Sequence, residues 1–239
     1  MGKLVHKNER LLFVIVFITS IFAWGWILYA TNSWADPDAA AATTESLLPP
    51  SSVSITKTPS VSEIFSLQAA ASKGDAEAQF QIGFINESQN NLAEAKSWYQ
   101  KAAEQGHIAA EVRLGGFYWS GQGVSKSITE AKKWFRKSLV ALKPAVKRGD
   151  AEAEYLLGSL YDKGWGVKQD FKTAMDLYLK AAAQGHVVAQ NALGVHYEQG
   201  DGVKKDLTEA KKWYQAAANQ GDPAGITHLQ RLQNTAIAQ

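Results

Sequence analysis

The sequence predicts an all-α solenoid preceded by one transmembrane helix. Glycines that close helix-like segments recur at spacings of 32, 43, 36 and 36 residues, and a period in this range is the signature of stacked helical hairpins. Near the N-terminus, Leu11 to Ala30 is a run of twenty residues without a charge, which is long enough to cross a bilayer. The recurring glycines are Gly74, Gly106, Gly149, Gly185 and Gly221.

The uncharged run sets the expected orientation of the chain in a membrane. Three basic residues within 1–10 precede it and none follows until Lys57, so the positive-inside rule places residues 1–10 in the cytoplasm. We therefore expect 11–30 to be a transmembrane helix or signal anchor, with the rest of the chain translocated. The alternative is a signal peptide cleaved near Ala35, which would leave a soluble periplasmic or secreted protein.

Residues 31–59 connect this segment to the repeats. From Ala35 to Pro59 the chain is rich in Ala, Ser, Thr and Pro and has too few large apolar side chains to build a core. We expect a flexible linker over 31–59 and the repeat solenoid over 60–239.

Each repeat opens with a segment whose small and apolar residues share one helix face. An Ala is followed four residues later by Leu or Ile, then by Gly, and usually by Tyr three residues further on. A glycine inside a helix costs roughly 1 kcal/mol against alanine, so its recurrence predicts a close approach of two helices. These glycines are Gly83, Gly115, Gly158 and Gly194.

The second segment of each repeat begins at a residue that caps helices well. Three of the four copies add a Glu three residues after the cap, which completes a capping box. An Ala follows four residues after the cap, and a Trp, or Leu in the third copy, follows after seven. We expect the Ala to face the glycine of the partner helix and the large side chain to fill the space between hairpins. The caps are Asn91, Ser127, Asp170 and Asp206.

Two copies depart from the pattern. The first lacks the Gly-x-Gly-Val loop, so its hairpin turn is expected to be four residues shorter. The second inserts seven residues between Ser138 and Gly149, about two helical turns, and Pro144 should kink or stop the longer helix. At the two ends, Ser60 to Lys73 and Asp222 to Asn234 are half-repeats suited to capping the stack.

The repeat pattern resembles the Sel-1-like repeat, a relative of the tetratricopeptide repeat. Leu193 to Gly221 carries L-G-x-x-Y-x-x-G-x-G-V-x-x-D-x-x-x-A-x-x-W-Y-x-x-A-A-x-x-G. The resemblance implies a right-handed superhelix of helical hairpins and a non-catalytic scaffold that binds a protein or peptide partner in a concave groove. Bacterial members act in the envelope, in signalling or in host interaction. The full repeats are expected at about 75–106, 107–149, 150–185 and 186–221.

Composition and motifs argue against several classes of chemistry. The net charge of +2 is too small for the electrostatic footprint of a nucleic-acid-binding protein, and the absence of cysteine removes thiolate metal sites and cysteine nucleophiles. The Gly-x-Gly-Val loops follow helices and lack Gly-Lys-Ser/Thr, so they are turns that permit positive φ rather than phosphate loops. We expect no catalytic residue, no metal and no cofactor.

The histidines lack metal-ligand spacing. His107 and His186 directly follow a closing glycine, where other copies have Asp, so we expect them to cap a helix or to be exposed. His196, near Glu198, is a lone candidate for a general base, and the sequence names no partner for it.

Three positions of the first helices define a candidate partner-binding ridge. Counted from the mid-helix glycine, positions −3, +1 and +4 share one ridge, which faces the groove in the tetratricopeptide relatives. Its mixture of aromatic and acidic residues suits a peptide-binding surface, although Phe80 and Phe84 equally fit a role in closing the irregular first hairpin. The predicted partner-binding residues are Phe80, Phe84, Val112, Trp119, Tyr155, Asp162, Asn191 and Glu198.

Together these observations predict a single-pass scaffold of the bacterial inner membrane, with its repeats in the periplasm and a protein or peptide partner. The alternative is a glycan-binding or glycan-processing accessory of the cell wall, with Trp119 and Trp165 stacking on sugars. Trp165 lies in a turn, where we expect it to be exposed or folded over a neighbouring hairpin.

Overall fold

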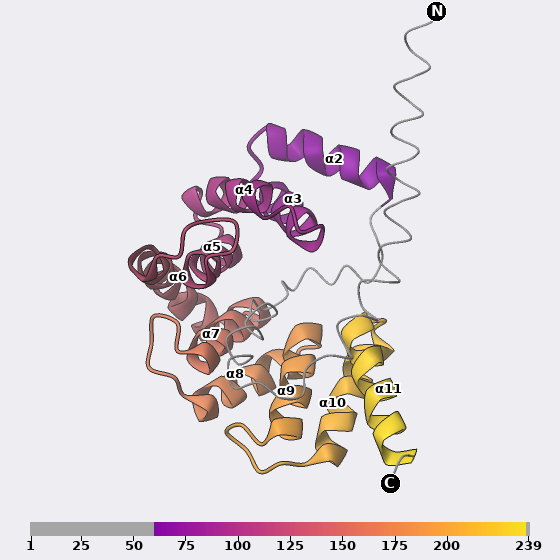
Figure 1. Ribbon diagram of the computed structural model, residues 1–239. Helices are drawn as coiled ribbons and strands as arrows, with labels where there is room; N and C mark the ends of the chain where they lie inside the picture. The colour runs from indigo at the N-terminus through magenta and orange to yellow at the C-terminus, as the bar shows by residue number, and fades with distance from the viewer. Residues whose placement is uncertain (1–59, 238–239) are drawn as a thin grey trace, which may run out of the picture. The chain divides into compact units, whose positions relative to one another are not determined.

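The computed structural model describes residues 60–237, and among these residues all regular structure is α-helical (Figure 1). The predicted transmembrane segment, 11–30, and the linker, 31–59, lie outside the described residues. Within the described part, no helix has the length and apolar character needed to span a membrane. The helices are α2 (Val61–Ser72), α3 (Ala76–Ser88), α4 (Leu92–Glu104), α5 (Ile108–Ser120), α6 (Ile128–Lys147), α7 (Ala151–Lys163), α8 (Phe171–Ala183), α9 (Val187–Gln199), α10 (Leu207–Asn219) and α11 (Pro223–Ile237).

Consecutive helices pair as hairpins, and each hairpin packs on the next (Figure 1). The first hairpin is α3 and α4, and α5–α6, α7–α8 and α9–α10 form the second, third and fourth. Helix α2 packs on α3 and α11 packs on α10, as half-repeats that cap a stack would. The predicted helical repeat solenoid is confirmed for the described residues.

A buried ring covers the mid-helix glycine of every hairpin. A Cβ atom added to Gly115 would lie 2.4 Å from Cε1 of Phe135, so the close approach of the two helices is confirmed. The ring stands eight residues after the N-cap, one helical turn beyond the alanine that we expected to face the glycine. These alanines are fully buried, and in the third hairpin the backbone oxygen of Ala174 lies 3.3 Å from the position of a Cβ on Gly158, so the ring and the alanine share this contact. The flat ring occupies the space that a Cβ atom on the glycine would fill. The other pairs are Gly83 with Tyr99, Gly158 with Tyr178, and Gly194 with Tyr214.

The large side chains seven residues after the N-caps occupy the space between units, as predicted. Trp98 is half-buried and packs against a cluster formed by Ala71 of α2 with Ala78 and Ile82 of α3. Leu177, which stands at the same position in the third hairpin, is 7% exposed.

The turns also follow the sequence pattern. Both glycines of each Gly-x-Gly-Val loop have positive φ, between 63° and 86°. Three residues separate α3 from α4 and seven separate α5 from α6, so the first turn is four residues shorter, as expected. In that shorter turn Asn90 adopts the left-handed conformation, with φ of 60°.

Most helix starts are capped by the residues that the sequence indicates. Ser60 and Glu63 form the predicted capping box on α2. Asn91 is an exception, since its side chain accepts no hydrogen bond from the described first turn of α4. Two of the glutamates expected in capping boxes pair instead with a lysine three residues further along the helix; these pairs are Glu130 with Lys133 and Glu209 with Lys212.

His107 and His186 cap helices, as expected from their position after the closing glycines. Nδ1 of His107 accepts a hydrogen bond from the amide of Ala110 at 3.2 Å, and Nδ1 of His186 accepts from the amide of Ala189 at 3.1 Å. Both imidazoles therefore carry their proton on Nε2, which is free to donate to another group.

Helix α6 is 20 residues long, whereas the other hairpin helices have 13. The longer second helix is confirmed. Of the two outcomes expected at Pro144, a kink or a stop, the stop is wrong, because the helix continues to Lys147. Proline cannot donate to the carbonyl of Val140, and Val140 is 75% exposed, so this carbonyl lies on the solvent side where water can satisfy it.

The seven additional residues shift where the third hairpin docks. The second glycine of each loop packs on the second helix of the preceding hairpin. Gly123 meets Leu92 and Gly202 meets Phe171, each the first residue of its helix, whereas Gly166 meets Phe135, the eighth residue of α6. The third hairpin is therefore displaced along α6 by seven residues, about 10 Å.

Candidate partner-binding surface

The structure buries three of the predicted partner-binding side chains in contacts between hairpins. Phe80 and Tyr155 are each 2% exposed and Val112 is fully buried. The Phe80 ring stacks on His107, with 4.6 Å between centroids, and the Tyr155 ring stacks on His186 at 4.7 Å. These side chains are occupied by contacts within the chain.

The acids four residues after the mid-helix glycines join neighbouring hairpins. Glu198 accepts a hydrogen bond from the hydroxyl of Tyr214, in its own hairpin, at 2.9 Å. It also accepts two hydrogen bonds from the guanidinium of Arg231, on α11, at 2.7 and 2.6 Å. We call such an acid, with its tyrosine and the cation of the next unit, an inter-hairpin clamp.

Among the clamps, the one between the first and second hairpins has the most buried cation. Glu87 accepts from the Tyr99 hydroxyl at 2.5 Å and from Nη1 of Arg113 at 3.2 Å. The side chain of Arg113 is 5% exposed, and its Nη2 has no hydrogen-bond partner among the described residues. Burial is the largest single effect and opposes the charge of Arg113, but Glu87 together with Tyr99, Tyr155 and Glu152 outweighs it and raises the pKa of the guanidinium.

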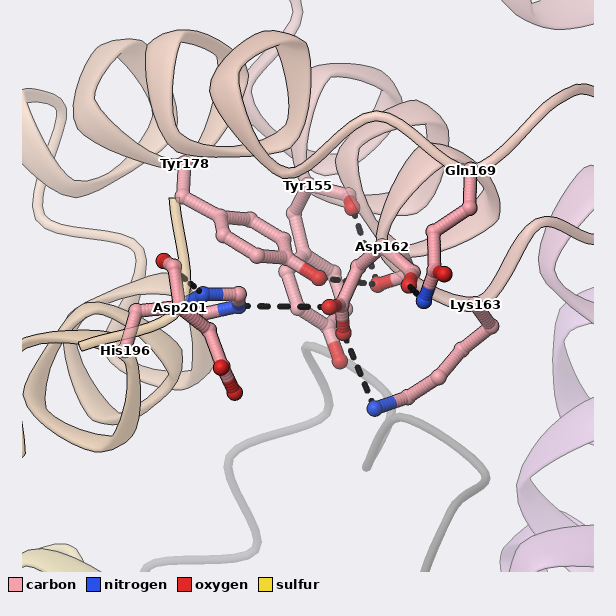
Figure 2. Close-up of polar contacts among 8 residues, drawn as sticks. Tyr155, Asp162, Lys163, Gln169, Tyr178, His196 and Asp201 are labelled. Carbon is pink, nitrogen blue, oxygen red and sulfur yellow. Dashed lines mark hydrogen bonds and ion pairs between the residues drawn. The ribbon is translucent and has the colours of Figure 1, made fainter. Parts of the chain in front are cut away.

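Figure 2 shows the clamp between the third and fourth hairpins, in which Asp162 meets His196. The tyrosine of this hairpin, Tyr178, donates its hydroxyl hydrogen bond to Oγ of Ser159 at 3.3 Å rather than to the acid. Nε2 of His196 lies 3.4 Å from Oδ1 of Asp162, and Nδ1 lies 2.9 Å from the carbonyl oxygen of Asp201. On the other side of the carboxylate, Lys163 Nζ lies 2.9 Å from Oδ2. Asp162 is 7% exposed and His196 is 5% exposed, so the predicted partner contact at Asp162 is also occupied within the chain.

Both ionisable groups of this clamp are shifted toward their charged forms. Burial disfavours the charged imidazole, but the hydrogen bonds to Asp162 and to the Asp201 carbonyl outweigh it and raise the pKa of His196. Burial likewise opposes the Asp162 carboxylate, but His196 and Lys163 outweigh it and lower the pKa of Asp162. Because both ring nitrogens of His196 face acceptors within the fold, the imidazole has a structural role rather than the role of the general base that the sequence left open.

The free energy of unfolding is expected to depend on pH through this clamp. The contribution of His196 is complete below its ordinary pKa, about 6.5, and is lost as pH rises through its raised pKa. The contribution of Asp162 is complete above about 3.8 and is lost as pH falls through its lowered pKa. The clamp should therefore stabilise most between about pH 4 and 6.5. The free energy of unfolding, measured with urea, should differ more between the parent and His196→Gln at pH 5.5 than at pH 8.5. Equal differences at the two pH values would contradict a stabilising role of His196 in the clamp.

The second hairpin replaces the clamp with aromatic packing. Trp119 stands where the other hairpins carry the acid, and Phe135 stands where they carry tyrosine. The Phe135 ring stacks on Trp165 of the third hairpin, with 5.0 Å between centroids, and lies 6.5 Å from the half-buried Trp119 ring. Trp165 is 4% exposed, so it is folded over the neighbouring hairpin, and the sugar-stacking alternative loses one of its two rings.

The remaining predicted residues keep part of their surface exposed. Asn191 donates to Asp222 at 2.6 Å, and Glu198 belongs to the last clamp. Phe84 and Trp119 are half-buried aromatic side chains of α3 and α5, and the Arg113 guanidinium lies 5.7 Å from the Phe84 ring centroid. Whether these four residues contact a partner stays a prediction.

One signal in the sequence indicates the clamps. An acid at the fourth position after the mid-helix glycine occurs in the hairpins whose covering ring is tyrosine, and it is absent from the hairpin whose ring is phenylalanine. The cations are not marked in this way, because Arg113 precedes its glycine by two residues and His196 follows its glycine by two. Within residues 60–237, no group of three or more acidic or histidine side chains is placed to hold a metal ion.

The family model described as Sel1 repeat matches residues 76–107, 108–139, 151–186 and 187–222. Chitin synthase regulatory factor 3 of Schizosaccharomyces pombe is 38% identical over 90 residues, which are 37% of this chain and 9% of that protein. The ERAD-associated E3 ubiquitin-protein ligase component HRD3B of Arabidopsis thaliana is 33% identical over 114 residues, 45% of this chain and 17% of that protein.

Among solved structures, the chain is similar to a Sel1 repeat protein from Oxalobacter formigenes, with 32% identity, a TM-score of 0.45, and coverage of 72% of this chain and 74% of that one. It is also similar to c5321, a protective antigen of uropathogenic Escherichia coli strains displaying an SLR fold, with 32% identity, a TM-score of 0.43, and coverage of 72% and 36%. The chain thus spans less than a fifth of the curated relatives named above. Because the repeat model matches more than half of its residues, the chain belongs to the Sel1 repeat family.

Proposed function

We propose that this protein is a membrane-anchored, non-catalytic scaffold that binds a protein or peptide partner. Sel1 repeat proteins are generally protein-interaction scaffolds, which supports the binding role. The uncharged run from Leu11 to Ala30 supports the anchor, with the N-terminus in the cytoplasm and the repeats in the periplasm of a bacterial envelope.

The observation that carries the proposal is the use of the ionisable side chains within the fold. Glu87, Asp162 and Glu198 are engaged in clamps, and the capping histidines donate to glutamates of the preceding hairpin. Groups that hold neighbouring hairpins together in this way are committed to structure, so they offer little for acid–base chemistry. What remains for recognition is the outer surface of the repeats, including Trp119.

The proposal is tested by photo-crosslinking in cells. A photoreactive phenylalanine analogue replaces Trp119 in the full-length protein, and the same analogue replaces Val140 as the control, since Val140 is 75% exposed on α6. A scaffold should give one defined protein adduct from position 119 that position 140 does not give. The absence of any position-specific protein adduct would contradict the proposal, and a glycan adduct would favour the cell-wall alternative.

A further inference from the structure

At most junctions the residue that caps the next hairpin closes the contact between hairpins. His107 donates to Glu77 at 2.9 Å and stacks on Phe80. His186 lies 3.0 Å from Glu152 and stacks on Tyr155 in the same arrangement. At the C-terminal end, Asp222 accepts from Asn191 at 2.6 Å. Each of these contacts fills the space between the starts of two successive first helices.

The junction between the second and third hairpins lacks this closure among the described residues. The capping residue there is Asp150, and the positions that correspond to the glutamate and the ring are Ala109 and Val112. The seven-residue displacement along α6 also separates the two helix starts by about two helical turns. The carboxylate of Asp150 caps its own helix through Oδ1, which accepts from the amide of Ala153 at 2.8 Å.

A pocket of about 270 Å³ lies at this junction, between the starts of α5 and α7 and the end of α6. This volume is below the roughly 300 Å³ at which sites for whole small molecules begin, and it suits one side chain of a larger partner. Its wall is apolar at Leu142, Ala145 and Leu156, while Phe80 and Ala109 line the side toward the first hairpins.

The charged residues of the pocket favour a cation. The carboxylates of Glu77, Asp150 and Glu152 line it, against the guanidinium of Arg148 and the imidazole of His107, which is bonded to Glu77. The hydrogen bond from His107 lowers the pKa of Glu77, which keeps that carboxylate ionised at neutral pH. A carboxylate accepts at both oxygens, so Asp150 and Glu152, which use Oδ1 and Oε2 within the chain, retain acceptor capacity.

We propose that this pocket receives an arginine or lysine side chain from a basic segment of a partner protein. The aliphatic stem of such a side chain would pack on the wall of Leu142, Ala145 and Leu156, and its charged head would reach the carboxylates of Asp150 and Glu152. The partner thereby supplies the donor that His107 and His186 supply at the neighbouring junctions. This inference rests on the scaffold function and names the chemistry of the partner.

The first test uses N-acetyl-arginine-amide as the probe and the full-length protein in detergent micelles, observed by methyl NMR. The probe should shift the methyl signals of Ala109, Ala145 and Leu156 in a saturable manner, and N-acetyl-citrulline-amide, which has the same shape without the charge, should bind about tenfold more weakly. Equal binding of the two probes, or no saturable shift from the arginine probe, would overturn the proposal.

A matched pair of variants locates the site. Asp150→Asn/Glu152→Gln removes two charges from the pocket and keeps a good N-cap, so it should weaken the arginine probe about tenfold. Asp170→Asn/Glu130→Gln removes the same two charges outside the pocket lining and should leave binding unchanged. Equal losses of probe binding in both variants would show a general effect of charge and would contradict binding in this pocket.

A photo-crosslinker in place of Ile108, which lines the pocket, separates this proposal from the scaffold function. Capture of a protein partner from position 119 but not from position 108 would overturn the pocket proposal alone. Loss of capture from both positions would overturn the scaffold function as well. Capture from position 108 that disappears in Asp150→Asn/Glu152→Gln would support both.

Discussion

Glu87→Ala is expected to lower the free energy of unfolding by about 3–5 kcal/mol, the largest effect of any substitution that we predict. The variant would leave the guanidinium of Arg113 charged, with a side chain that is 5% exposed and whose Nη2 already lacks a partner within the described residues. Removing one member of a buried ion pair is costly because the desolvated charge of the other member is then uncompensated. Urea unfolding of the full-length protein measures the loss.

The matched variant is Arg113→Met, which removes the cation and keeps an unbranched side chain of similar length. Glu87 then retains the hydroxyl of Tyr99 and is 18% exposed, so its charge is still partly solvated. We expect Arg113→Met to cost less than half as much as Glu87→Ala. Comparable losses in the two variants would mean that packing at this position, rather than the uncompensated charge, decides the stability.

Gly115→Ala is expected to lower the free energy of unfolding by about 1–3 kcal/mol, although alanine is the better helix former by about 1 kcal/mol. The new methyl group would lie 2.4 Å from Cε1 and 2.6 Å from Cδ1 of Phe135, and this ring is fully buried. The helices must separate or the ring must move, and movement would disturb its stack on Trp165. Urea unfolding measures the loss of stability, and near-ultraviolet circular dichroism reports a movement of the aromatic rings.

Phe135→Leu in the same chain is the control for this prediction. Leucine leaves room for the methyl group, so Gly115→Ala should cost clearly less in the Phe135→Leu background than in the parent. If the cost is the same in both backgrounds, steric contact with the ring is not its cause.

The repeat architecture could be predicted from the sequence because its signals are local. The positive φ of the loop glycines and the capping by His107 and His186 depend on a few neighbouring residues, and the structure confirms both. Pro144 was harder to interpret, since its tolerance depends on which side of α6 faces solvent. The sequence pattern alone does not show which side of α6 faces solvent, because this depends on how the hairpins pack.

The candidate site was less predictable because it depends on contacts between hairpins. Positions −3 and +4 of the first helix were expected to face a groove, yet the structure places Phe80 and Tyr155 under the capping histidines of the next hairpin. Asp162 was likewise placed on the predicted ridge and instead meets His196 from the following repeat. Repeat periodicity identifies equivalent positions, but it does not reveal which of them the next repeat covers.

The clamps have a consequence for how such a chain can evolve. The basic residue that pairs with Glu87 stands before the mid-helix glycine of the second hairpin. The basic residue that pairs with Asp162 stands after the mid-helix glycine of the fourth hairpin. If the second and fourth hairpins exchanged places, the position that faces Glu87 would hold Ala192 instead of a basic residue, and the position that faces Asp162 would hold Phe117. Although the hairpins look interchangeable, each acid is matched to its own successor. Duplication or reshuffling of these repeats is therefore expected to cost stability at the boundaries that the two clamps close.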